Sequence, residues 1–303
     1  MKATKRIVAS SVVAAAMGGP SLALAEDTFR AEAGLSYSRF KTDSARLDTA
    51  GAEATYFFDK LPAQPKDYPL EQAQFVERIG SITANYSQSS FDSSSFDASS
   101  RGRAYGETVL LARPDTPFFA SAGVTSGNSG KLQGGFGESE IDSRTYLLSV
   151  GAYLDKTTAL SLALLRNKAR IEGTSFGSPF VTRNTFTSIE FFGQHLAQLS
   201  GGDHVVLAAG LALDKNEPES AASEKNRSVF LQGTYYPVKT LGLKLGVQVD
   251  RGDDRPAEGE SYSAGVKMFV TPRISLSVDY QRTLAKLPSF NDSIVLLKGL
   301  VRF

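Results

Sequence analysis

Apolar and polar residues alternate one by one along most of the chain, a pattern typical of β-strands that bury one face and wet the other. The stretch 241–251 is a clear case: Leu243, Leu245, Val247 and Val249 fall in one phase, and Lys244, Gly246, Gln248 and Asp250 in the other. The same alternation recurs at 203–215, 259–270 and 274–283. The pattern therefore predicts an all-β chain.

Fourteen such runs can be marked as strands. They cover 29–40, 47–58, 79–91, 100–111, 117–127, 139–154, 159–171, 181–196, 203–215, 226–237, 241–251, 259–270, 274–283 and 291–303. Strands of soluble sheets usually have about 5–6 residues, whereas a membrane barrel needs about 9–11. Because many of these runs are that long, we predict a single antiparallel transmembrane β-barrel of about fourteen strands, with twelve or sixteen as alternatives.

The connections alternate in length, as expected of barrels with short periplasmic turns and longer extracellular loops. Short turns fall at 155–158, 238–240 and 271–273, and longer polar loops at 92–99, 128–138, 172–180, 216–225 and 252–258. The even strand number brings both ends of the chain to the short-turn side. The glycine-rich loop 128–138 is predicted to be flexible enough to fold inward as a constriction.

One connection on the short-turn side is long. The segment 59–78 contains Pro62, Pro65 and Pro69, and its end, 70–78, has apolar residues at helical spacing. We expect an extended periplasmic loop that ends in one or two turns of helix. The alternative is that the segment tucks into the barrel as a plug.

Aromatic residues cluster beside the short turns, where the rings of outer-membrane barrels form interfacial girdles. The predicted girdle consists of Tyr56, Phe57, Phe58, Phe118, Phe119, Tyr153, Phe191, Phe192, Tyr235 and Tyr236. The alternative is that these are ordinary core aromatics.

The first residues have the form of an export signal. Lys2, Lys5 and Arg6 precede an apolar stretch, and Ala23-Leu24-Ala25 is a small-x-small cleavage site. The stretch is too short and too rich in small residues for a membrane anchor. We therefore expect a signal peptide at 1–25, a mature barrel at 26–303, and export to the outer membrane of a Gram-negative cell.

Composition excludes several functions. The chain has 33 Lys and Arg against 32 Asp and Glu, a net charge of +1. The leader holds three of these bases and no acid, so the mature chain is slightly acidic, which argues against a nucleic-acid partner. The chain has no cysteine, which excludes disulfides and thiol chemistry.

Catalysis and metal binding have little support. The two histidines, His195 and His204, flank the turn 197–202 and lie near Asp203, which would make at most a weak metal site. Neither zinc-ligand spacing nor a phosphate-cradling loop is present. We therefore predict no catalytic residue, no metal and no cofactor.

The alternation also assigns charged residues to the lumen. The predicted pore-lining set is Glu53, Arg101, Arg103, Glu107, Arg144, Arg183, Glu190, Lys244, Asp250, Lys267, Asp279 and Lys298, with Arg302 and either Arg166 or Lys168 as further candidates. Bases on one wall and acids on the other would impose a transverse field that favours small polar solutes. The alternative is that these charges neutralise one another inside a closed barrel.

The last strand carries a motif of outer-membrane barrels: Gly299, then Val301, then a terminal Phe303. With the Tyr56-Phe57-Phe58 strand end, the proline-rich stretch, 71–78 and the strand 81–87, it makes the chain resemble the family of putative general porins of Gram-negative bacteria. The resemblance covers most of the mature chain. Gly299 lies about one position later than usual, and Arg302 replaces a commoner neutral residue.

The resemblance implies a porin: a water-filled pore for passive diffusion of small hydrophilic solutes and ions. It further implies that Gly299, Val301 and Phe303 serve as the signal for insertion by the barrel assembly machinery. Expected partners are outer-membrane lipid and lipopolysaccharide, and the resemblance also implies a homotrimer as one oligomeric state. The alternative function is a structural or partner-binding barrel with a closed lumen.

Overall fold

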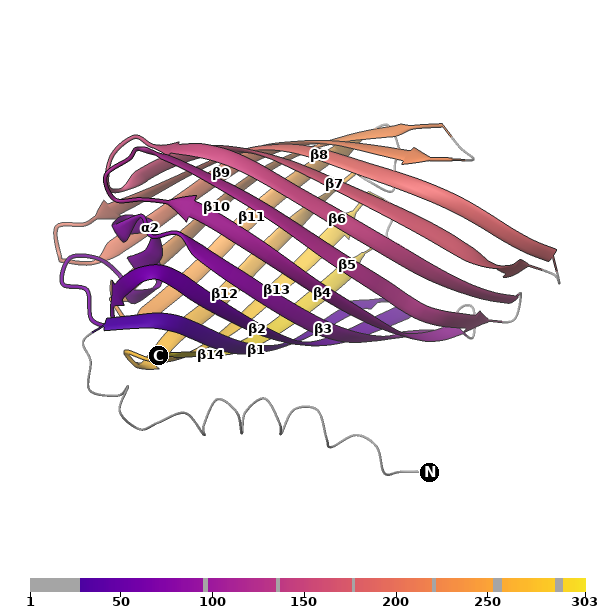
Figure 1. Ribbon diagram of the computed structural model, residues 1–303, viewed down its shortest axis with the longest axis horizontal. Helices are drawn as coiled ribbons and strands as arrows, with labels where there is room; N and C mark the ends of the chain where they lie inside the picture. Colours follow the sequence, from indigo (N-terminus) through magenta and orange to yellow (C-terminus); the bar gives the residue numbers. More distant parts are fainter. Residues whose placement is uncertain are drawn as a thin grey trace, which may run out of the picture.

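The computed structural model describes residues 28–94, 98–134, 137–175, 178–219, 222–252, 258–286 and 291–303. Each of the fourteen predicted strands has a counterpart in it (Figure 1). The strands are β1 (Thr28–Thr42), β2 (Ala45–Pro62), β3 (Ser81–Ser93), β4 (Ala98–Ala112), β5 (Phe118–Gly134), β6 (Gly137–Tyr153), β7 (Thr158–Ser175), β8 (Ser178–Gln198), β9 (His204–Pro218), β10 (Glu224–Val238), β11 (Leu241–Gly252), β12 (Gly259–Thr271), β13 (Ile274–Ala285) and β14 (Asp292–Arg302). The predicted leader, 1–25, lies outside the described residues and stays a prediction.

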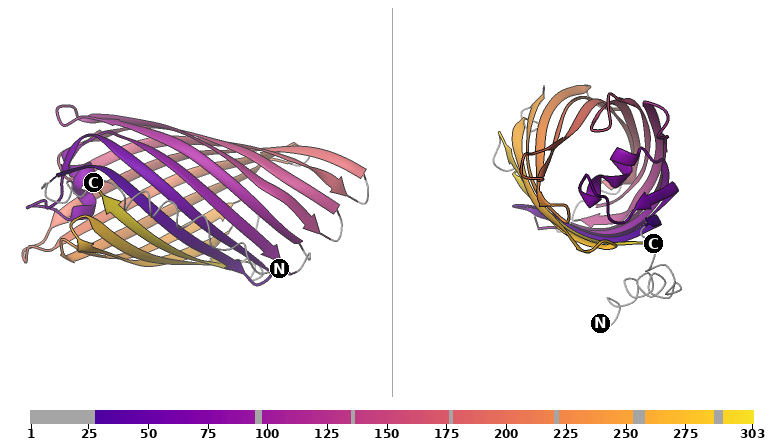
Figure 2. Two further views of the ribbon diagram at one scale, coloured as in Figure 1. Left: turned by 60° about the horizontal axis from the view of Figure 1, so that its bottom comes forward. Right: turned by 90° about the vertical axis from the view of Figure 1, so that its left-hand side faces the viewer.

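The strands form one closed antiparallel barrel. Each pairs with its neighbours in the chain, and β1 pairs with β14, so the sheet has no free edge (Figure 2). The end of the chain completes the closure: the carbonyl of Phe303 accepts the N–H of Arg30 at 2.7 Å, and its N–H donates to Ala31 at 2.8 Å. The predicted fold class is confirmed, with fourteen strands rather than twelve or sixteen.

The strands extend farther than the sequence pattern indicated, at the expense of the predicted long loops. β5 continues to Gly134 and β6 begins at Gly137, and these two glycines pair directly across the two strands. The prediction that 128–138 is a loop able to fold inward is therefore wrong, because most of it is strand. A bulge at Gly130, with φ +64°, absorbs the register shift; a side chain there would collide with the carbonyl of Arg101.

The long connection after β2 folds into two short helices, η2 (Leu70–Gln72) and α2 (Ala73–Glu77). Pro69 precedes the first helical residue with φ −62°, a conformation suited to helix entry. Arg78 ends α2 in the left-handed conformation, and its N–H returns to the carbonyl of Phe75 at 3.3 Å. Within the described residues, no helix is long and apolar enough to cross a membrane.

The segment that carries these helices lies inside the short-turn end of the barrel (Figure 2). Its residues share a buried apolar cluster with inward side chains of the wall. The cluster comprises Phe29, Phe57, Leu61, Ala63, Tyr68, Ala73, Ile79, Leu196, Val206 and Tyr236, with Phe75 and Val76 packed against it. The short helix expected at the end of the segment is present, and its packing on the inner wall agrees with the alternative that the segment tucks into the barrel.

The turn between β6 and β7 fixes the end of α2. The carboxylate of Asp155 accepts the N–H and the hydroxyl of Thr157 at 2.6 and 2.8 Å, and these bonds lower the pKa of Asp155 to about 2. Its backbone carbonyl accepts a bond from Arg78 at 2.7 Å, while the guanidinium lies 4.7 Å from the centre of the Tyr153 ring. The side chain of Arg78 thus supports a backbone conformation that usually favours glycine.

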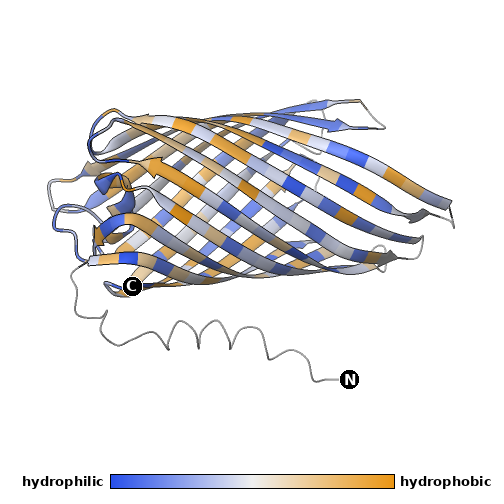
Figure 3. Cartoon of the chain, viewed as in Figure 1, coloured by the Kyte–Doolittle hydropathy of each residue, from blue (hydrophilic) through white to orange (hydrophobic). Residues whose placement is uncertain are grey.

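The predicted aromatic girdle is only half correct. Neighbouring side chains of a strand point to opposite faces, so each aromatic pair is divided between lipid and lumen. Tyr56, Phe58, Phe118, Phe191 and Tyr235 are exposed on the outer surface, whereas Phe57, Phe119, Tyr153, Phe192 and Tyr236 face inward. The inward rings form much of the surface on which the helical segment packs. Figure 3 shows the same alternation as short bands of opposite hydropathy along each strand.

We expect Phe57→Ala to lower the free energy of unfolding by about 3–5 kcal/mol, the usual cost of removing a buried Phe side chain. Phe57 is 2% exposed and packs edge-to-face on Phe29, whereas its neighbour Phe58 is 47% exposed and faces outward. Phe58→Ala is the matched control and should cost less. Urea unfolding in detergent micelles, followed by circular dichroism, measures both, and equal losses would contradict the assignment of the two faces.

Candidate functional site: the lumen of the barrel

The pairing register assigns every strand residue to the inner or the outer face. Lys244, Gly265 and Asp279 lie opposite one another on β11, β12 and β13, and so share a face. The adjacent Leu243 and Leu245 belong to the other face, where large apolar side chains are exposed. Because the helical segment packs on the face that carries Lys267 and Tyr236, that face is the lumen.

The register places part of the predicted pore-lining set inside and part outside. Glu53, Glu190, Lys244, Asp250, Lys267, Asp279 and Lys298 face the lumen, and so does Arg302. Arg101, Arg103, Glu107, Arg144 and Arg183 face outward, as do Arg166 and Lys168. For this second group the predicted orientation is wrong.

The prediction assumed that a charged residue must avoid the outer face, and this assumption does not hold for these strands. On β4 the outward phase carries Arg101 and Arg103 together with the exposed Tyr105 and Leu111, while the inward phase consists mainly of small residues. Strands as long as β8, with 21 residues, exceed the 9–11 needed to cross the hydrocarbon. The ends of such strands beside the long hairpins therefore project into water, where outward charges such as Arg101 and Arg183 are tolerated.

The inward bases of the described strands are held in ion pairs. Lys298 lies 2.6 Å from Glu53, Arg302 lies 2.8 Å from Glu32, and Lys267 lies 3.0 Å from Glu71 of the helical segment. Lys244 pairs with Asp279. Acids and bases therefore lie together on the wall from β11 to β2. The described inward bases thus do not form a wall separate from the acids, which a transverse field would require.

Two inward glycines make room for these pairs. Gly265 lies between Lys244 and Asp279, and a Cβ at that position would collide with the carboxylate and come within 3.1 Å of Lys244 Cε. A Cβ at Gly34 would lie 3.1 Å from Cγ of Glu53. The ion pairs thus cross the intervening strands over glycines, where no side chain separates the charges.

The helical segment is attached to several strands by polar contacts. Glu71 accepts bonds from Lys267 at 3.0 Å and from the hydroxyl of Tyr236 at 2.9 Å. Gln72 accepts a bond from Gln194 at 2.9 Å, and its own amide donates to Tyr236 at 3.3 Å. These partners belong to β12, β10 and β8, so the segment is anchored across a wide part of the inner wall.

Arg302 is the anchor that the sequence least suggested. Its guanidinium is nearly buried, with its carbon 4.6 Å from the centres of both the Phe29 and the Phe269 rings. It donates to Glu32 at 2.8 Å and to the carbonyl of Leu70 at 3.3 Å. The residue that departs from the usual terminal motif therefore joins the last strand to the helical segment.

The histidines do not form a common site. His204 is buried, and its Nε2 lies 3.0 Å from the carbonyl of Asp67, whereas His195 faces outward, with Nδ1 2.9 Å from the hydroxyl of Thr158. In the described part of the chain, no group of three or more His, Cys, Asp or Glu side chains could hold a metal ion.

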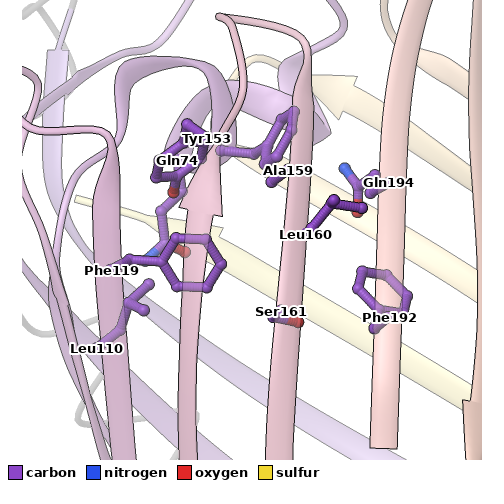
Figure 4. Close-up of a pocket in the computed structure, with 10 residues that line it drawn as sticks. Gln74, Leu110, Phe119, Tyr153, Ala159, Leu160, Ser161, Phe192 and Gln194 are labelled. Carbon is purple, nitrogen blue, oxygen red and sulfur yellow. The ribbon is translucent and has the colours of Figure 1, made fainter.

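A hollow of about 210 Å³ remains between α2 and the wall formed by β4 to β8 (Figure 4). Phe75 of α2 and the inward rings of Phe119, Tyr153 and Phe192 line it, together with the amides of Gln74 and Gln194. Phe119 and Tyr153 also contact each other, with ring centroids 4.9 Å apart. The segment thus narrows the lumen on one side with a surface that is partly aromatic and partly polar.

At the end of the chain, Gly299 and Val301 belong to the outward phase of β14, opposite Leu276 and Ile274. Phe303 follows the last strand residue and is bonded to β1 through its backbone. Their use as an insertion signal remains a prediction.

Comparisons with known proteins agree with this architecture. The profile of a family described as putative general bacterial porin matches residues 1–303. The outer membrane protein Omp33 of Acinetobacter baumannii is similar in structure, with a TM-score of 0.53 at 15% identity over 91% of this chain and 99% of that one. The monoaromatic hydrocarbon channel CymD has a TM-score of 0.50 at 10% identity over 91% and 89% of the two chains. At these identities the structural likeness shows the fold alone. No match was found among curated protein sequences.

Single cysteines can test the assignment of the two faces, because the chain has none of its own. We expect Gln232→Cys, on the inward phase of β10, to react readily in proteoliposomes with a charged, water-soluble thiol reagent. Its neighbour Leu231→Cys, on the exposed apolar face, should react far more slowly because lipid disfavours the thiolate. Measured labelling rates that are equal for the two variants would overturn the assignment.

Proposed function

The chain belongs to the family of putative general bacterial porins, and on that premise we propose that it conducts small hydrophilic solutes and ions by passive diffusion. As a member of this family it is an outer-membrane channel protein.

The observation that carries the proposal is the polar inner face of the barrel. On β3 the inward residues are Ser81, Thr83, Asn85, Ser87, Ser89, Phe91 and Ser93, and on β13 they are Ser275, Ser277, Asp279, Gln281 and Thr283. Hydroxyl, amide and carboxylate groups of this kind can replace part of the hydration shell of a solute. An inner face built to fill a dry barrel would instead be apolar.

The barrel size and the helical segment support a limit on solute size. Eight strands leave room only for side chains or one small ligand, whereas sixteen to eighteen leave an aqueous channel. Fourteen strands fall between these cases, and part of the short-turn end is occupied by η2 and α2. A narrow path beside the segment therefore fits small solutes better than large ones.

The remaining expectations belong to the same proposal. The short-turn end would face the periplasm and the long hairpins the exterior, as in other barrels of this kind. Residues 1–25 would be removed on export. Insertion by the barrel assembly machinery, contact with lipopolysaccharide and a homotrimeric state are further parts of the proposal. The mainly alanine, glycine, serine and threonine inner face of β3–β7 offers no support for an enzyme.

Channel activity is tested in planar bilayers with refolded mature chain. We expect stable single-channel steps and, in proteoliposomes, swelling rates that fall as the size of an added sugar increases. A barrel that inserts and shows sheet by circular dichroism, yet passes neither ions nor sugars, would contradict the proposal. That result would favour the alternative, a structural or partner-binding barrel with a closed lumen.

The same cysteine variants supply a control within the bilayer. A charged thiol reagent should reduce the step size of Gln232→Cys, because the added group narrows the aqueous path. The currents of Leu231→Cys and of the unmodified chain should stay the same. A change in all three would show that the reagent acts on the membrane rather than on the lumen.

A further inference from the structure

We propose that the lumen selects cations over anions, because its unneutralised charges are acidic and most of them lie on the wall from β8 to β11. This inference rests on the proposed function, since selectivity requires that ions pass through the barrel.

The bases on the inner face are neutralised by ion pairs. Among the described residues, the bases on the inward phase of the strands are Lys244, Lys267, Lys298 and Arg302, and each lies in one of the ion pairs described above. At the short-turn rim, Arg273 is buried and donates to the carbonyl of Thr28. The paired lumenal bases therefore contribute little net positive charge to the path of an ion.

The inner face carries more acids than its ion pairs use. Glu190, Asp214, Glu224, Asp250 and Asp292 are inward strand residues that take part in no ion pair within the described part of the chain. Three of them accept hydrogen bonds from neutral groups: Gln248 donates to Asp250 at 2.9 Å, Asn216 to Glu224 at 3.2 Å, and the hydroxyl of Ser188 to Glu190 at 3.4 Å. A neutral donor leaves the negative charge of a carboxylate in place.

Three of these acids lie close together on neighbouring strands. Glu190 of β8 lies opposite Ala212, which lies opposite Ser228, which in turn lies opposite Asp250 of β11. Asp214 occupies the neighbouring row between Ser188 and Asn226. Since adjacent strands are about 4.8 Å apart, Glu190, Asp214 and Asp250 form one acidic strip across four strands. The bases next to it in sequence, Lys215 and Arg227, belong to the outward phase.

Uncharged oxygens extend the strip toward the long hairpins. A hollow of about 340 Å³ there is lined by Asp214, Asn216, Glu224 and Asn226, together with Asn184, Phe186 and Lys225, of which Lys225 belongs to the outward phase of β10. The side-chain oxygens of Asn184 and Asn226 are buried without a hydrogen-bond donor in the described residues. Carboxylate and amide oxygens of this kind stabilise a partly dehydrated cation and repel an anion.

The field of such a strip acts over the width of a narrow lumen. A pore with low-dielectric walls focuses the field of its lining charges and enriches the counter-ion. The Debye length is about 10 Å at 0.1 M salt and about 3 Å at 1 M. We therefore expect selectivity at low salt that weakens as the salt concentration rises.

The test is the reversal potential of single channels under a KCl gradient. We expect a permeability ratio of potassium to chloride above one near 0.1 M salt, falling toward one near 1 M. The combined variant Glu190→Gln, Asp214→Asn, Asp250→Asn should lower the ratio at low salt while stable steps persist. An absence of steps in the unmodified chain would refute the proposed function, whereas stable steps with a ratio of one or less would refute only the selectivity.

The ion pair between Glu53 and Lys298 provides a test in both directions. This test does not depend on the folding of the combined variant. Glu53→Gln leaves Lys298 uncompensated and should lower the ratio, while Lys298→Gln leaves Glu53 uncompensated and should raise it. Glu107→Gln removes a charge from the outer face and is the matched control, with no change expected. Equal ratios for Glu53→Gln, Lys298→Gln and the unmodified chain would overturn the proposal.

Discussion

Every other feature of this molecule depends on closing the sheet between β1 and β14. Inside a bilayer, an unpaired backbone N–H or C=O has no water to bond with, so a sheet that spans it must have no edge. Eleven residue pairs, from Glu32–Arg302 to Thr42–Asp292, join the first strand to the last, and the backbone of Phe303 adds further bonds. Closure also sets which phase of each strand faces the lumen.

Once the faces are fixed, the two sides of the wall obey different rules. The outer face carries large aliphatic side chains, since lipid is its solvent over the hydrophobic belt. The inner face is polar and in places very small, and its glycines at 34 and 265 allow opposite charges to meet across a strand. Charge inside the barrel is therefore organised by pairing across strands, and among the described inward charged residues of the strands those outside the ion pairs are acidic.

The helical segment converts a simple barrel into one with an asymmetric interior. It buries Ala73 and packs Phe75 on Tyr153, so it replaces water by apolar contact at one end of the lumen. Glu71 and the carbonyl of Leu70 then engage Lys267 and Arg302 from distant strands. These contacts make the segment part of the wall, and they explain why inward aromatic rings lie so close to the membrane interface.

The sequence by itself determined that the strands belong to a membrane barrel with lipid on one face and a polar interior on the other. It also determined the number of strands and the existence of a short helix after the proline-rich stretch. These depend on local periodicity, and alternation over ten or more residues leaves few other folds. Only the tertiary structure decided which phase points inward on β4, β6, β7 and β8, because charged residues tolerate the outer face wherever a strand projects beyond the lipid. It also decided that Arg302 supports the helical segment and that the lumenal lysines are neutralised. Such pairings join residues far apart in the chain, and their partners follow from the register of the closed barrel, which no local pattern contains.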